Sequence, residues 1–83
     1  MPAPERQSGR IFVQAGAFAR PENAERVRTR IAMLGKTEVV RVKVNGVALW
    51  RVRVGPVAGE AAAHHLLSRV VARGYPDARV VDR

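Results

Sequence analysis

The alternation of apolar and polar residues along this chain predicts two similar strand–helix units. The first begins at Ile11–Phe18, where apolar residues dominate and Val and Phe favour an extended backbone. Alternate side chains of a strand point to opposite faces. One set then faces a core, namely Ile11, Val13 and Ala15, and the other set faces away, namely Phe12, Gln14 and Gly16. Gln14 is either a residue of a solvated face or part of a binding surface, and this stretch alone leaves both readings open.

A helix is predicted after this strand, because apolar residues then recur at helical spacing at Ala24, Val27, Ile31 and Leu34. Pro21 suits the first turn of a helix, where its missing N–H group costs nothing, and Gly35 suits the end. A second helix is predicted over about residues 60–73. Its apolar stripe consists of Ala63, Leu66, Leu67 and Val70, and Gly74 closes it.

Two alternating strands and a tight turn are predicted between the helices. The first strand, Glu38–Val44, should place Val40, Val42 and Val44 inward and Arg41 and Lys43 outward. Asn45 and Gly46 tolerate positive φ and give a strong hairpin signal. The return strand, Leu49–Val54, should place Trp50, Val52 and Val54 inward and Leu49, Arg51 and Arg53 outward. We expect Gly55-Pro56 to end this strand and residues 78–81 to form a short last one.

The two halves of the chain match at an offset of 39 residues, which aligns Val13 with Val52 and Gly35 with Gly74. The element order is therefore βαββαβ. We predict an α+β, split-βαβ fold of the RNP or ferredoxin-like type, with a four-stranded antiparallel sheet and both helices on one face. The first and third strands would be central. The open sheet face would carry Phe12, Gln14, Arg41, Lys43, Leu49, Arg51 and Arg53.

Length and composition limit the function classes. With 83 residues the chain suffices for one small domain, which we place at residues 10–83, after a flexible linker remnant at residues 1–9. The absence of cysteine excludes disulfides and thiolate chemistry, and no apolar run approaches the roughly 18 residues that a membrane span requires. The net charge of +8 attracts polyanions non-specifically, but the chain contains no Lys/Arg run.

Catalytic and metal sites are not expected. His64 and His65 are adjacent in a helix and point about 100° apart, so they cannot chelate one ion together. Ser68 and Thr29 have no visible base partner, so we predict neither an enzyme nor a cofactor. One alternative is a nucleic-acid-binding βαββαβ domain, but only Phe12 is a clear outward aromatic and the RNP1 pattern is missing. Another is a protein-interaction or dimerisation module.

The chain resembles the SPOR family, the sporulation-related repeat domains of bacteria, over about residues 10–82. The resemblance is carried by the segments Phe12–Phe18, Glu22–Glu25, Leu49–Val57 and Gly74–Ala78. It implies a non-catalytic module that binds peptidoglycan with its open sheet face and recognises glycan strands stripped of their stem peptides, called denuded glycan. It also implies a domain of a larger exported protein, which it targets to the cell wall or division septum in the periplasm.

The resemblance further implies individual site residues. The family's binding glutamine matches Gln14, its sheet-face arginine matches Arg51, and its bulky aromatic position matches Leu49 or Trp50. Ala17 stands where the family often has Ser. The expected ligand-binding set is Phe12, Gln14, Gly16, Ala17, Arg41, Leu49, Trp50, Arg51 and Arg53. The expected partners are peptidoglycan glycan strands rather than a specific nucleic acid, and we expect a monomer. An Arg can meet a lactyl carboxylate with two parallel N–H bonds, and an amide can both donate and accept.

Overall fold

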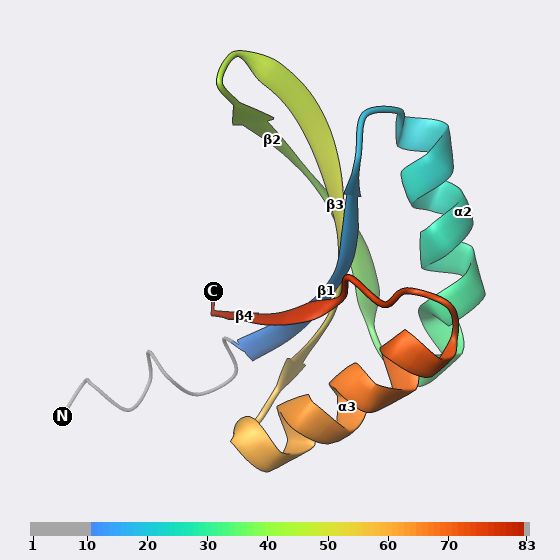
Figure 1. Cartoon of the computed structure of the whole chain (residues 1–83), viewed down its shortest axis with the longest axis vertical. Coiled ribbons are helices and arrows are strands. Elements are labelled where there is room, and N and C mark those ends of the chain that lie inside the picture. The colour runs from blue at the N-terminus through green and yellow to red at the C-terminus, as the bar shows by residue number, and fades with distance from the viewer. Residues whose placement is uncertain (1–10, 83) are drawn as a thin grey trace, which may run out of the picture.

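The computed structural model describes residues 11–82 and confirms the predicted α+β architecture. The elements are β1 (Ile11–Phe18), α2 (Pro21–Ile31), the 3₁₀ turn η1 (Ala32–Leu34), β2 (Thr37–Val44), β3 (Val47–Val57), α3 (Glu60–Ala72) and β4 (Arg79–Asp82). The strands form one antiparallel sheet in the order β2-β3-β1-β4. Both helices cover the same side of this sheet (Figure 1). The linker expected at residues 1–9 lies outside the described residues.

The core lies between the two helices and the central strands β1 and β3. Its largest fully buried side chains are Ile31, Val13, Val52, Val54 and Val70. Burying each such side chain stabilises the fold by about 1.5–3 kcal/mol. The apolar stripes predicted for the helices are confirmed, because Ala24, Val27 and Ile31 of α2 and Ala63, Leu66 and Val70 of α3 are all buried.

Strand β3 continues beyond its predicted end at Gly55-Pro56. The pairing of Val13 with Val54 and of Ile11 with Val57 gives β3 one extra residue, which forms a bulge. Gly55 adopts a φ of 135° there, and a Cβ atom at this position would lie 3.0 Å from the carbonyl oxygen of Ile11. The prediction was wrong because the pairing with Ile11 extends the strand past a local breaking signal.

Strand β1 contains a second irregularity that reverses its alternation. Gln14 pairs with Arg53 and Gly16 with Val52, so Ala15 is an extra residue on β1. Paired residues of neighbouring strands share a face, and Val52 belongs to the core. Gly16 therefore lies on the helix side, not on the open face as predicted. Ala17, which pairs with Arg51, lies on the open face.

The facing of β2 is opposite to the prediction. Val40 pairs with Arg51 and Val42 with Leu49, so these valines lie on the open face. Arg41 pairs with Trp50 on the helix side, where its Cζ lies 5.8 Å from the centre of the Trp50 ring. Lys43 follows Arg41 to that side by alternation. The Asn45-Gly46 turn sets this register by pairing Val44 with Val47.

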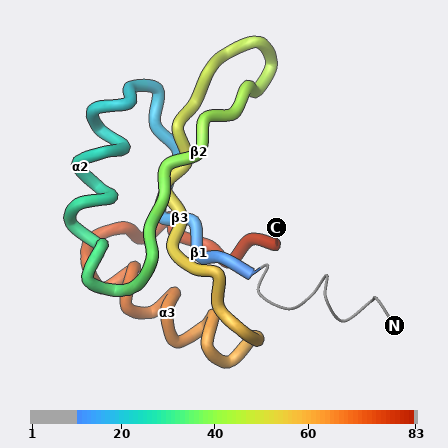
Figure 2. The backbone as a smooth tube through the Cα atoms, turned by 180° about the vertical axis from the view of Figure 1, so that it is seen from behind, coloured from blue at the N-terminus to red at the C-terminus, as the bar shows by residue number. Residues whose placement is uncertain are grey.

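The open face of the sheet is curved. The tip of the β2–β3 hairpin bends away from the helices at one end, and β4 bends to the same side at the other (Figure 1). Seen from behind, the hairpin rises past the end of α2 and is not covered by either helix (Figure 2). This curvature leaves a hollow over β1 and β3.

Candidate functional site: a groove on the open sheet face

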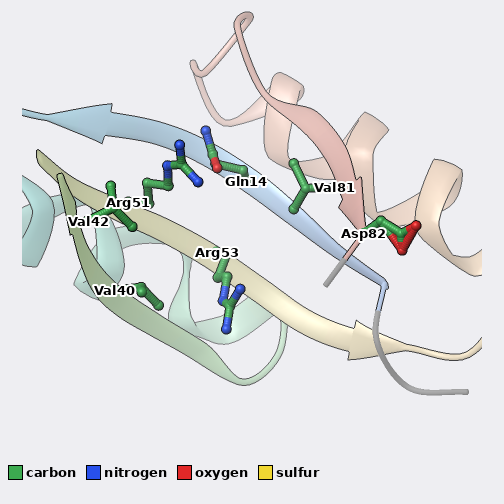
Figure 3. Close-up of a pocket in the computed structure, with 7 residues that line it drawn as sticks. All are labelled: Gln14, Val40, Val42, Arg51, Arg53, Val81 and Asp82. Atoms are coloured by element: carbon green, nitrogen blue, oxygen red, sulfur yellow. The ribbon is translucent and has the colours of Figure 1, made fainter. Parts of the chain in front are cut away.

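The hollow on the open face is a groove of about 480 Å³. All four strands contribute to its lining, which consists of Gln14, Val40, Val42, Arg51, Arg53, Val81 and Asp82 (Figure 3). The central strands supply Gln14, Arg51 and Arg53, β2 supplies two valines, and β4 supplies Val81 and the carboxylate of Asp82. The site thus combines an amide, two guanidinium groups and one carboxylate with apolar walls.

Gln14 forms part of the groove floor and is the one buried polar residue of the described chain. The residue is 8% exposed, yet its amide has no hydrogen-bond partner among residues 11–82. Buried polar groups are normally hydrogen-bonded, and each exception calls for an explanation such as a ligand or water. Because no fully buried side-chain N or O atom of the described residues lacks a partner, the amide must reach the groove surface.

Arg51 and Arg53 are held differently although they are two residues apart on β3. The Nε of Arg53 donates to Oε2 of Glu38 on β2 over 2.9 Å, and its Cζ lies 4.0 Å from the centre of the Phe12 ring. Arg53 therefore covers Phe12, which is only 5% exposed. Arg51 has no ion pair or hydrogen bond with any residue of the described chain, and its guanidinium points towards Gln14 (Figure 3).

The structure gathers most of the predicted site residues on the open face but rearranges several. Gln14, Arg51 and Arg53 line the groove. The register also places Phe12, Ala17 and Leu49 on this face, by pairing them with Val81, Arg51 and Val42. Three predicted residues lie on the helix side instead: Gly16, Arg41 and Trp50. Trp50 packs against the core, as its alternation with Val52 predicts.

Several groove residues escaped the sequence analysis. Val40 and Val42 were assigned to the core, and Val81 and Asp82 were not considered. Two neighbours of groove residues were not considered either, namely Glu38, which pairs with Arg53, and Arg79, which pairs with Gln14. A signal for β2 existed: a two-residue Asn45-Gly46 turn pairs Arg41 with Trp50, so the two cannot face opposite sides. For Arg79 no comparable local signal existed, because its facing follows from its pairing with Gln14 across the sheet.

Residues 11–82 contain neither a candidate metal site nor a candidate membrane-spanning helix. They contain no group of three or more His, Cys, Asp or Glu side chains that could hold a metal ion. None of the helices within residues 11–82 has the length and apolar character needed to cross a membrane. A smaller hollow of about 250 Å³ lies beside the end of β1 and is lined by residues 15–18 and 74–77. Ala17 thus borders this hollow as well as the open face.

Comparisons with known proteins agree with this fold. The family model of the SPOR domain matches residues 7–81. The crystal structure of the RlpA SPOR domain from Pseudomonas aeruginosa is similar at a TM-score of 0.73 and 26% identity, covering 88% of this chain and 99% of that chain. The solution structure of the peptidoglycan binding domain of the B. subtilis cell wall lytic enzyme CwlC is similar at a TM-score of 0.67 and 28% identity, covering 92% and 91% respectively. The comparison with curated proteins found no match.

Proposed function

Because the chain belongs to the SPOR domain family, whose model matches residues 7–81, we propose that it binds peptidoglycan and recognises denuded glycan strands. The SPOR domain is a non-catalytic binding module of the bacterial cell envelope. The similarity to a peptidoglycan binding domain over 92% of this chain supports the ligand class. The proposal extends to targeting: the domain directs a larger exported protein to the periplasmic cell wall and the division septum.

The observation that carries the proposal is the amide of Gln14. Gln14 is 8% exposed, and its amide has no protein hydrogen bond among the described residues and lies at the floor of a groove. An amide offers both donors and an acceptor, and sugar hydroxyl and N-acetyl groups offer the complementary atoms. Because the amide reaches the groove surface, a ligand in the groove can hydrogen-bond to it directly.

The remaining groove residues fit the other parts of a glycan. The guanidinium of Arg51, which has no ion pair or hydrogen bond within residues 11–82, can meet a carboxylate with two parallel N–H bonds. A denuded strand exposes such groups, because the lactyl carboxylate of muramic acid is free once the stem peptide is removed. Val40, Val42 and Val81 give the groove apolar walls against which the C–H faces of sugar rings can pack.

The structure gives less support to nucleic-acid binding on the same fold. RNA-recognition domains stack bases on exposed aromatic side chains of the central strands. Phe12 is the aromatic predicted to face outward, but it is 5% exposed and lies under Arg53. Phe18 and Trp50 pack against the core on the helix side. The described open face therefore presents no aromatic ring for stacking.

The proposal is tested by a sacculus pull-down with two substrates. Sacculi digested with an amidase, which leaves bare glycan, are compared with undigested sacculi. We expect retention on the digested sacculi to exceed that on the undigested ones, and to fall for Gln14→Glu and for Arg51→Ala. Arg30→Gln is the matched control for the charge change of Gln14→Glu, because Arg30 is exposed on α2, on the opposite side of the sheet.

Equal retention on both substrates would refute the preference for denuded glycan, and no retention on either would refute the function itself. Non-specific polyanion attraction is separated by salt, because it falls steeply as the salt concentration rises. Targeting is tested by a fluorescent fusion of the domain exported to the periplasm. Septal enrichment that disappears with Arg51→Ala is the expected result, and uniform envelope fluorescence of the wild type would contradict it.

A further inference from the structure

We infer that Arg79 of β4 is a second anion contact of this site, so that one glycan strand places two acidic groups on the sheet, one at Arg51 and one at Arg79. This inference rests on the proposed function and adds a residue that neither the sequence pattern nor the family resemblance indicated. It also assigns Arg53 a different role, in which its side chain shapes the groove and does not contact the ligand.

The pairing of β4 with β1 places Arg79 beside the groove. Arg79 pairs with Gln14, and Val81 pairs with Phe12. Paired residues share a face, so Arg79 lies on the same open face as Gln14. Val81, which is two residues further along β4 and therefore on the same face, lines the groove. The side chain of Arg79 is exposed.

The available positive charge on the open face belongs to Arg51 and Arg79. Neither makes an ion pair or side-chain hydrogen bond with another residue of the described chain. Arg53, in contrast, is paired with Glu38 and stacked on Phe12, and its side chain is 26% exposed. An anion would compete with Glu38 for Arg53, whereas no carboxylate of the described chain is paired with Arg51 or Arg79; Asp82 lines the groove but forms no ion pair with either.

The positions of the two arginines suit an extended polyanion rather than a single small anion. Arg51 lies on β3 and Arg79 on β4, two strand spacings apart, and Arg51 is two residues along β3 from the partner of Gln14. Ideal strand spacings then separate their Cα atoms by about 12 Å, diagonally across Gln14. In a denuded strand the muramic acid carboxylates recur on alternate sugars. Two contacts to one strand strengthen binding more than either alone, since the second is intramolecular.

The test measures the affinity of the purified domain for bare glycan strands and for the same strands after conversion of their carboxylates to methylamides. The variants are Arg79→Gln and, as the charge-matched control, Arg73→Gln, because Arg73 is exposed in the turn that follows α3. We expect Arg79→Gln to weaken binding to bare glycan about tenfold, the loss typical of a charge-assisted hydrogen bond. The control should change it by less than about twofold. On methylamide glycan the wild type should bind weakly, and Arg79→Gln should bind like the wild type.

Thermal unfolding of both variants checks that the fold is intact, which the exposure of both side chains leads us to expect. If Arg79→Gln and Arg73→Gln bind bare glycan equally well, the second contact is refuted while the proposed function stands. The same holds if Arg79→Gln loses as much affinity for methylamide glycan as for bare glycan. Failure of the wild type to bind bare glycan would refute the proposed function and this inference together.

Discussion

Replacing Gln14 by Met separates the cost of this residue to the fold from its use in binding. Met has the same unbranched length but no amide, so it fills the same space with apolar atoms. Burying an amide without a hydrogen bond costs about 1–3 kcal/mol in protein mutational data. The amide of Gln14 touches the groove surface and keeps part of its hydration. We therefore expect Gln14→Met to raise the free energy of unfolding by about 0–2 kcal/mol.

The same substitution should weaken binding. A ligand that hydrogen-bonds to both ends of the amide would lose two bonds, each contributing about 0.5–1.5 kcal/mol, which corresponds to a loss of affinity of about tenfold. Stability is measured by urea unfolding followed through the fluorescence of Trp50, the single tryptophan of the chain. Each 1 kcal/mol should move the thermal midpoint by about 4–8 °C in a domain of this size. Binding is measured by retention on amidase-digested sacculi.

The control is Asn23→Met, which removes a half-buried amide, whose Oδ1 accepts a hydrogen bond from Arg26, from α2 on the other side of the sheet. It should leave retention unchanged. A fall of more than about 1 kcal/mol in the stability of Gln14→Met would show that the amide is hydrogen-bonded in the folded protein, contrary to our reasoning. Unchanged retention would show that the amide does not contact the ligand. Higher stability with lower affinity is the pattern of a residue kept for function.

Two further predictions concern the scaffold. Gly55→Ala should lower the free energy of unfolding by about 2–4 kcal/mol, because it combines an unfavourable φ with a Cβ 3.0 Å from the oxygen of Ile11. Gly59→Ala is the control and should cost less, because its φ is also unfavourable but no atom lies within 4 Å of the new Cβ. Equal losses of stability in urea titrations would contradict the steric argument. In the same titrations Ile31→Ala should lower the free energy of unfolding by about 2–5 kcal/mol, because Ile31 is fully buried. Met33→Ala, at a position that is 60% exposed, should change the free energy of unfolding by no more than about 0.5 kcal/mol. Similar losses for Ile31 and Met33 would place the core elsewhere.

Local patterns were sufficient for the elements and the fold. The helical stripe through Ala24, Val27 and Ile31 reports which side of α2 is buried, because the period of a helix is a property of the segment itself. The internal repeat and the Asn45-Gly46 turn together gave the βαββαβ order. The last turn of the first predicted helix is the 3₁₀ turn η1, which carries Leu34 to the edge of the core.

The predicted facing of the strand residues was right where alternation could be followed from a buried partner, and wrong where a bulge interrupted it or the pattern fitted both faces. On β3, the buried Val52 and Val54 correctly place Arg51 and Arg53 on the other face. On β2, valines occur in both registers, at Val39 and Val40, so the pattern alone does not distinguish the two faces. A shift of one residue exchanges every side chain between the faces of a sheet.

The sequence by itself determined the period of each element, the turns, the helix faces that enter the core and the family. Only the tertiary structure decided which side chains meet at the groove. The bulge at Ala15 brings Ala17 beside Arg51 on the open face, and the pairing with β4 brings Arg79 beside Gln14. Glu38 and Phe12 engage Arg53, whereas the described chain leaves Arg51 without a polar partner. These contacts join residues far apart in sequence, and cross-strand register, which local periodicity does not encode, determines them.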